Sequence, residues 1–90
     1  MTFKLDDANQ YRIDLKLPLL ILGASKGLLA CGYLNVDTFN KTSEAAAIVT
    51  GVKNYEDMLA ASVVAVSDEA SRLGVSLGDS GQDALDKMSD

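Results

Sequence analysis

The clearest pattern in the chain is an unbroken alternation of apolar and charged residues over residues 11–17, Tyr-Arg-Ile-Asp-Leu-Lys-Leu. A period of two is typical of a β-strand with one buried and one solvent-facing side. Pro18 has no N–H to donate to a neighbouring strand, so it should end this strand or begin the next. The alternation predicts that four residues form the buried side: Tyr11, Ile13, Leu15 and Leu17.

Two continuous apolar runs follow, at residues 19–22 and 28–31. Residues 23–27, Gly-Ala-Ser-Lys-Gly, lie between them, and glycine adopts the backbone angles that tight loops need. Two short apolar runs joined by such a loop indicate a β-hairpin. Lys26 should then lie at the tip of the hairpin, in water.

The next elements should be short. Asn35 is a good N-cap for a helix of about two turns that ends near Lys41. Residues 45–50, Ala-Ala-Ala-Ile-Val-Thr, are closed by Gly51 and fit a buried central strand. Asn54 and Asp57 resemble a capping box for a helix that ends near residue 61.

Residues 62–66, Ser-Val-Val-Ala-Val, are rich in β-branched side chains and indicate a last buried strand. Ser67 should cap a third short helix, which Gly74 should close in the left-handed conformation. After Leu77 the composition becomes acidic, with little to bury, so residues 77–90 are expected to form a mobile acidic tail beyond a compact domain of residues 1–76. The alternative for this segment is a short helix capped by Ser80 that docks Leu85 and Met88.

These elements predict an α/β (mixed α+β) fold. An N-terminal antiparallel meander passes into strand-helix-strand units, which gives one mixed sheet with three short helices. Such connections are right-handed where the two strands are parallel. Two consecutive apolar strands require cover on both faces of the sheet, and three short helices cover only part of it. We therefore expect a homo-oligomer, with a dimer favoured.

Composition narrows the classes of function. The chain has 90 residues with 48% hydrophobic residues, which suits a single domain. Eight basic residues against 13 acidic ones give a net charge of −5, and no two basic residues are adjacent. A nucleic-acid site needs clustered positive charge, so we expect no nucleic-acid partner.

We also expect no membrane partner. Residues 17–34 are nearly long enough to span a bilayer, but the cluster Gly-Ala-Ser-Lys-Gly interrupts them at the centre. The first seven residues contain no apolar stretch of the kind that a signal peptide needs. The single cysteine, Cys31, cannot form an intrachain disulfide. A small secreted domain usually carries several disulfides, so the cytoplasm is the expected compartment.

Three segments carry a resemblance to a known family: Cys31-Gly-Tyr-Leu-Asn35, residues 44–53 (Glu-Ala-Ala-Ala-Ile-Val-Thr-Gly-Val-Lys) and Tyr55-Glu-Asp-Met-Leu59. Pro18-Leu-Leu and Val64-Ala-Val-Ser67 extend it. Over residues 10–74 the chain resembles the YunC-like family of small prokaryotic proteins of unknown function. The resemblance implies a compact α/β domain in the cytosol, and it supplies no catalytic residues. The acidic segment after Leu77 lies outside it.

The sharpest candidate for chemistry is Cys31, which ends a predicted strand shortly before a predicted helix start. The partial positive charge of a helix N-terminus stabilises a thiolate. Gly32 would let a ligand approach the backbone, and Tyr33 and Asn35 could donate or accept hydrogen bonds. The alternatives are that Cys31 is core packing, that Asn35 is only an N-cap and that Tyr33 is an interface residue.

A second candidate site is Thr50-Gly51-Val52-Lys53, where a strand, a glycine and a helix start follow one another. Backbone N–H groups at such a position hold anions, and Lys53 would add a positive charge. The plain alternative is a turn at Gly51. The chain has no histidine, which excludes catalytic sites and zinc sites built on an imidazole. We expect no metal site and no cofactor.

Three hypotheses of function remain. The first and favoured one is a non-catalytic oligomeric binding or regulatory module. The second is a small enzyme that uses the Cys31 thiol, with Tyr33, Lys53 or a carboxylate as the proton acceptor. It requires Cys31 and Lys53 to lie close together, as they would if the third and fourth strands were parallel neighbours. The third is a structural subunit that docks on a larger partner.

Overall fold

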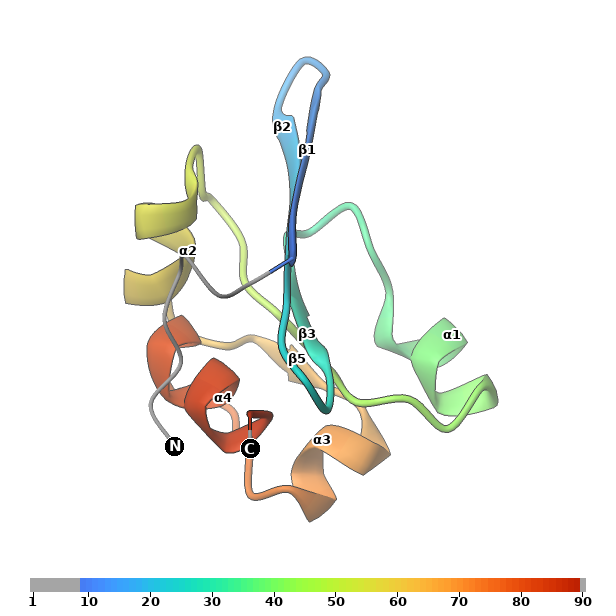
Figure 1. Ribbon diagram of the computed structural model, residues 1–90. Coiled ribbons are helices and arrows are strands. Elements are labelled where there is room, and N and C mark those ends of the chain that lie inside the picture. Colours follow the sequence, from blue (N-terminus) through green and yellow to red (C-terminus); the bar gives the residue numbers. More distant parts are fainter. Residues whose placement is uncertain (1–8, 90) are drawn as a thin grey trace.

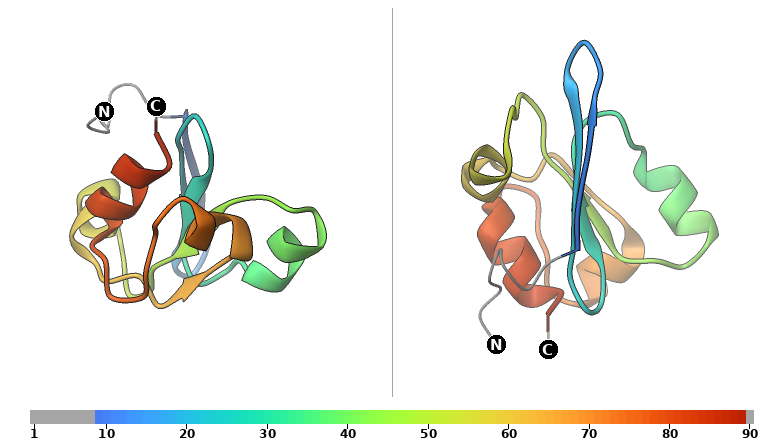
Figure 2. Two further views of the ribbon diagram at one scale, coloured as in Figure 1. Left: turned by 90° about the horizontal axis from the view of Figure 1, so that it is seen from below. Right: turned by 45° about the horizontal axis from the view of Figure 1, so that its top comes forward.

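A computed structural model of the protein describes residues 9–89. Within these residues it contains one five-stranded sheet in the order β1-β2-β3-β4-β5 and four short helices. In Figure 1 the sheet is seen nearly edge-on, with α2 and α4 on one side and α1 on the other, and Figure 2 shows the same layers from below. The elements are β1 (Asn9–Asp14), β2 (Pro18–Gly23), β3 (Leu28–Ala30), α1 (Val36–Lys41), β4 (Ala46–Ile48), α2 (Tyr55–Ala60), β5 (Ala65–Val66), α3 (Asp68–Arg72) and α4 (Gly81–Lys87).

The predicted fold class is confirmed. β1, β2 and β3 form an antiparallel meander, and β3 pairs parallel with β4 after the connection through α1. The connection through α2 also joins two strands of the sheet, but β5 runs antiparallel to β4, so it is not a parallel crossover. The parallel pair lies at the centre of the sheet, and all three residues of β4 are buried.

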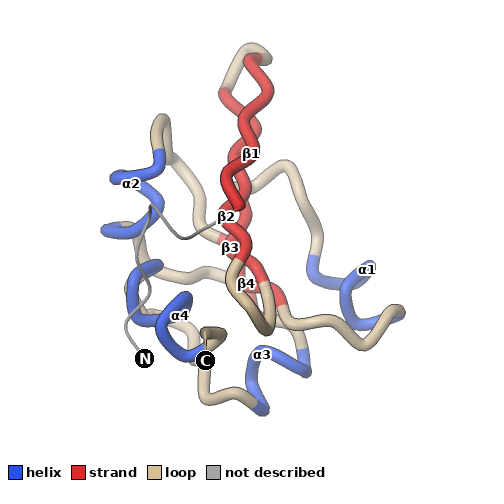
Figure 3. The backbone as a smooth tube through the Cα atoms, in the orientation of Figure 1, coloured by secondary structure: helices blue, strands red, loops and turns tan. Residues whose placement is uncertain are grey.

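The hairpin formed by β1 and β2, called the projecting hairpin below, extends beyond the rest of the molecule, as the tube view in Figure 3 shows. Pro18 begins β2, as expected. The predicted buried side of the first strand is wrong within this chain, because no element of residues 9–89 covers it and β1 is an edge strand. The four residues of that side are 51–65% exposed: Tyr11, Ile13, Leu15 and Leu17.

The three predicted helix caps are confirmed. The Asn35 side chain accepts a hydrogen bond from the N–H of Asp37, and the Asn54 side chain accepts one from the N–H of Asp57. Ser67 caps α3 and also fixes it to the sheet, because its buried hydroxyl accepts from the N–H of Ala46 at 2.8 Å. Gly74 closes α3 at φ +97°, the left-handed conformation that was expected.

The expected mobile tail after Leu77 must be corrected. Residues 81–87 form α4, whose N-cap is Ser80, and the alternative of a docked helix therefore describes this segment. Leu85 and Met88 are 0% exposed and belong to the main core cluster. The segment contains few apolar residues, but Ala84, Leu85 and Met88 lie on one helix face, which is enough to close the core.

Two further contacts hold α4 in place. Gly81 lies directly against the backbone carbonyl of Met58 in α2, a separation that leaves no room for a Cβ atom. The Lys87 ammonium donates to the Asp79 carboxylate at 2.8 Å. This hydrogen bond, helped by one from the N–H of Ser76, lowers the pKa of Asp79 below its ordinary value of 3.8.

The remaining strand predictions hold with shorter bounds. The strand expected at residues 62–66 is reduced to the two residues of β5. Residues 17–34, the most apolar stretch, form β2, a turn and β3 rather than a helix. Within residues 9–89 no helix has the length and hydrophobicity that crossing a bilayer requires.

Candidate functional site

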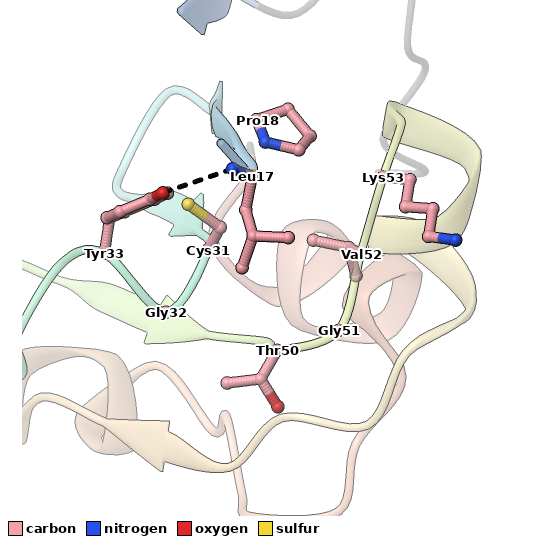
Figure 4. Close-up of a pocket in the computed structure, with 9 residues that line it drawn as sticks. All are labelled: Leu17, Pro18, Cys31, Gly32, Tyr33, Thr50, Gly51, Val52 and Lys53. Atoms are coloured by element: carbon pink, nitrogen blue, oxygen red, sulfur yellow. Dashed lines mark hydrogen bonds between the residues drawn. The ribbon is translucent and has the colours of Figure 1, made fainter. Parts of the chain in front are cut away.

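A cavity of about 330 Å³ lies where β3 and β4 end. Because these strands are parallel neighbours, their carboxyl ends meet at one edge of the sheet, a common place for ligand sites. β2 runs antiparallel to β3, so the start of β2 lies at the same edge. Figure 4 shows the nine residues that line the cavity: Leu17, Pro18, Cys31, Gly32, Tyr33, Thr50, Gly51, Val52 and Lys53.

Cys31 follows β3 directly and continues its pairing with β2. Its N–H donates to the carbonyl of Leu20 at 3.1 Å, and the N–H of Leu20 donates to the Cys31 Sγ at 3.3 Å. The residue is only 4% exposed. The thiol therefore forms part of the inner wall of the cavity, and the neighbouring strand already uses it as a hydrogen-bond acceptor.

Tyr33 links the wall of the cavity to the projecting hairpin. Its hydroxyl oxygen accepts a hydrogen bond from the N–H of Leu17 at 3.4 Å, and the side chain is 47% exposed. Gly32, beside it, lies close to the end of β4, since a Cβ atom at this position would be 3.2 Å from the Thr50 Cγ2. The close approach of Gly32 and Thr50 brings the two candidate segments together.

The turn after β4 forms the opposite wall. Gly51 has φ +71°, a conformation that favours glycine, and it reverses the chain before α2. The N–H of Lys53 donates to the Asp57 carboxylate at 3.1 Å, so an internal carboxylate already accepts from the backbone at the start of α2. In Figure 4 the side chain of Lys53 points away from the Cys31 thiol.

The structure brings together six of the seven candidate residues: Cys31, Gly32, Tyr33, Thr50, Gly51 and Lys53. The seventh, Asn35, does not line the cavity and serves as the N-cap of α1. Two lining residues, Leu17 and Pro18, were not predicted, and Val52 was predicted only as part of the second candidate segment. Pro18 could have been predicted from the hairpin of residues 19–22 and 28–31. Its two strands are antiparallel, so the start of β2 lies beside the end of β3.

The chemistry available in the cavity is mainly apolar contact. Leu17, Pro18 and Val52 supply hydrocarbon surface, and the Tyr33 hydroxyl supplies a polar group at the wall. Residues 9–89 contain no group of three or more His, Cys, Asp or Glu side chains that could hold a metal ion. This arrangement suits the retention of a small, mostly apolar molecule.

Comparison with known proteins identifies the family. The family model described as Domain of unknown function (DUF1805) matches residues 30–88 of the chain. The chain belongs to this family. The match includes both walls of the cavity around Cys31 and Val52, and it also includes α4, so the segment after Leu77 is part of the DUF1805 match. The YunC-like label remains a prediction.

A solved structure shares the fold of this chain. The chain is similar to the crystal structure of a protein of unknown function from Thermoplasma acidophilum, with 36% identity and a TM-score of 0.78. The similarity covers 90% of this chain and 92% of that one. No match is found among curated proteins. The solved structure therefore establishes a shared fold, and the activity is left to be inferred from the site.

Proposed function

We propose that this DUF1805 protein is a non-catalytic binding module, which holds a small, mostly apolar molecule in the cavity at the ends of β3 and β4. The observation that carries the proposal is the convergence of two separate segments, residues 31–33 and 50–53, on one cavity of about 330 Å³. This volume lies at the lower end of the range of about 300–1,000 Å³ typical of small-molecule sites.

The lining suggests the chemistry of the ligand. Three aliphatic side chains favour an apolar body, and the Tyr33 hydroxyl accepts from the N–H of Leu17 while its own proton can be donated. A suitable ligand would therefore combine a small ring or branched chain with one hydrogen-bond acceptor, such as a carbonyl.

The single thiol, with no disulfide partner, supports a cytoplasmic location.

Binding is favoured over catalysis because Cys31 lacks the surroundings of an activated nucleophile. Its thiol is buried and accepts from Leu20, and the Lys53 side chain points away from it. Native Cys31 should consequently react with iodoacetamide slowly between pH 5 and 10, and quickly only after denaturation. Fast alkylation of the folded protein near neutral pH would instead favour the thiol enzyme.

The binding test uses acetophenone as the probe, since it joins an aromatic ring to a carbonyl. Amide NMR shifts should move at Gly32, Tyr33, Gly51 and Val52, and should stay constant in the loop of residues 75–78. Leu17→Asp should abolish the shifts. Leu77→Asp is the matched control, because both leucines are 65% exposed and Leu77 does not line the cavity.

A second variant tests the polar contact. Tyr33→Phe keeps the ring and removes the hydroxyl, so it should weaken acetophenone binding several-fold and leave the binding of ethylbenzene, which has no carbonyl, unchanged. The proposal is wrong if millimolar acetophenone moves none of the four amides, or if Leu17→Asp and Leu77→Asp bind it equally well.

A further inference from the structure

The outer edge of β1 carries backbone groups that no strand within residues 9–89 pairs with. Leu20 directs both its N–H and its carbonyl to Cys31. Successive residues of a strand direct these groups to opposite sides, so Leu19 and its β1 partner Ile13 direct theirs toward each other. The N–H and carbonyl groups of Arg12 and Asp14 therefore point outward, along the outer edge of β1.

The outer edge of β1 lacks the features that usually prevent an edge strand from pairing with another chain. Protected edges tend to be short or carry charges, often lysine, that repel another strand. β1 is six residues long, its exposed side chains include Tyr11 and Ile13, and it carries one charge of each sign, Arg12 and Asp14. Since the hairpin projects beyond the helices, another strand can reach this edge (Figure 1).

We propose that β1 pairs antiparallel with β1 of a second copy, about a two-fold axis at Ile13. The side chains select this register. An axis between two residues would place the apolar side of one copy beside the charged side of the other, because opposed residues in a sheet share a face. An axis at Arg12 or at Asp14 would place like charges opposite each other. Among the axes within β1, the one at Ile13 opposes Arg12 to Asp14 of the second copy, twice in each dimer.

The backbone geometry fits the same register. Arg12 and Asp14 of the two copies form the hydrogen-bonded pairs on either side of the axis, because their N–H and carbonyl groups point outward. Ile13 faces Ile13 of the second copy in a close, non-hydrogen-bonded pair. Tyr11 then lies beside Leu15 of the second copy, so the exposed apolar row becomes continuous across the interface and the two sheets become one. The symmetry is that of an isologous dimer.

The first experiment measures molar mass by light scattering over a range of concentrations. The wild-type protein should show twice the chain mass of 9.5 kDa. Ile13→Asp should give monomers, and Val64→Asp is the matched control, because Val64 is 54% exposed and Ile13 is 55% exposed. Neither residue lines the cavity, so failure of the dimer leaves the proposed ligand site untouched, and the reverse also holds.

Charge substitutions then test the complementarity. Arg12→Asp leaves two acidic residues on the edge, and Asp14→Arg leaves two basic ones, so each variant alone should dissociate about tenfold or more readily than wild type. An equimolar mixture of the two variants should form a heterodimer. The Arg12–Asp14 ion pair within one strand, 2.9 Å in the monomer, is absent from both variants, so only pairing between copies explains the recovery.

Disulfide trapping tests the register itself. In a Cys31→Ala background, Ile13→Cys should form a covalent dimer on mild oxidation. The Cα atoms of a non-hydrogen-bonded pair are about 4.5 Å apart, within the range of about 4.4–6.8 Å that disulfides need. Tyr11→Cys should not cross-link, since the two copies of this residue would be about 13 Å apart, four positions along the strand.

Three results would overturn the proposal. The first is a wild-type protein that remains monomeric at high micromolar concentration. The second is a dimer that Ile13→Asp and Val64→Asp weaken equally. The third is a dimer that Ile13→Asp breaks while the Ile13→Cys variant forms no cross-link, which would assign the interface to the face of the hairpin rather than to its edge. Circular dichroism of each variant confirms that the fold is intact.

Discussion

The projecting hairpin and helix α4 are opposites in this molecule. The hairpin carries the most regular apolar pattern of the chain, yet every residue of β1 is exposed. Helix α4 has an acidic sequence with few apolar residues, yet Leu85 and the adjoining Met88 are completely buried. The comparison shows that an apolar pattern identifies side chains that can be buried, whereas the packing of other elements decides which of them are buried within one copy.

The two regions also differ in how they are fixed. α4 packs on α2 through a glycine that lies against a backbone carbonyl, and the Asp79–Lys87 pair holds its end. The hairpin is held to the body through β3 and through the hydrogen bond between Leu17 and Tyr33. Substitutions in α4 should therefore change the stability of the single copy, and substitutions in β1 should change association.

The largest difference is expected for truncation of a core side chain. Leu85→Ala should lower the free energy of unfolding by about 2–5 kcal/mol, because it leaves a cavity in the core. Leu77→Ala, at a residue that is 65% exposed, should change it by less than about 0.5 kcal/mol. Urea denaturation followed by circular dichroism measures both. Equal effects would mean that α4 does not close the core.

The next largest difference in stability is expected between alanine substitutions at two glycines, Gly81 in α4 and Gly23 in β2. Gly81→Ala should cost about 1–3 kcal/mol or more, since the new Cβ would overlap the Met58 carbonyl and the two helices must separate. In Gly23→Ala the new Cβ would lie 3.2 Å from the Asn9 Cβ, and a shift of a few tenths of an ångström in the exposed edge strand β1 relieves this contact, so the cost should be below about 1 kcal/mol. Urea midpoints of the two variants compare them directly. A smaller cost at Gly81 than at Gly23 would contradict the close packing of α4 on α2.

Acid should loosen α4 before it affects the hairpin. The pKa of Asp79 is lowered in the folded protein, chiefly by the hydrogen bond from Lys87. The unfolded chain therefore binds a proton more readily, and the stabilisation is complete above the ordinary value of 3.8 and is lost as the pH falls through the folded pKa. Asp79→Asn should thus be less stable than wild type near pH 6, and the difference should shrink below about pH 4.

Asp14→Asn is the control for this experiment. Its ion pair with Arg12 is largely exposed, so the substitution should change the stability of the single copy little at either pH. Thermal unfolding at pH 3 and pH 6 measures both variants. A difference between wild type and Asp79→Asn that stays constant from pH 3 to pH 6 would contradict the lowered pKa.

The smallest effect is expected at the centre of β1. Ile13→Ala, in a solution dilute enough to keep the protein monomeric, should change the free energy of unfolding by less than about 0.5 kcal/mol. At high concentration the wild type should gain stability over the variant, because association favours the folded form by mass action. Urea midpoints at two protein concentrations test this. A large effect in dilute solution would mean that Ile13 packs within its own copy.

Local signals predicted most of the fold. Asn35, Asn54 and Ser67 each begin a helix because their side chains satisfy N–H groups that a helix start leaves free. The strand positions followed from apolar runs bounded by glycine and proline. The position of α4 could not be predicted in this way, because its burial depends on the space between α2 and the sheet, which is a property of the assembled fold.

The candidate site was predictable where topology follows from chain order. The connection through α1 joins two apolar runs that pair in parallel, and parallel neighbours bring Cys31 and Thr50 to the same edge of the sheet. The connection through α2 has the same pattern, yet β4 and β5 are antiparallel, so the pattern alone does not decide the strand direction. Asn35 was misplaced because an N-cap and a ligand-binding residue give the same sequence signal. Leu17 was missed because an apolar side chain in a cavity wall resembles one in the core.

The place of α4 in the chain also determines when folding can finish during synthesis. Leu29 is made early, whereas Leu85 follows it by 56 positions (85 − 29). At about 5–20 residues per second, roughly 3–11 s pass between the two. During that interval the growing chain holds an open core and an exposed β1 edge, so chaperones, or the nascent chain on a neighbouring ribosome, can contact β1 before the core is closed.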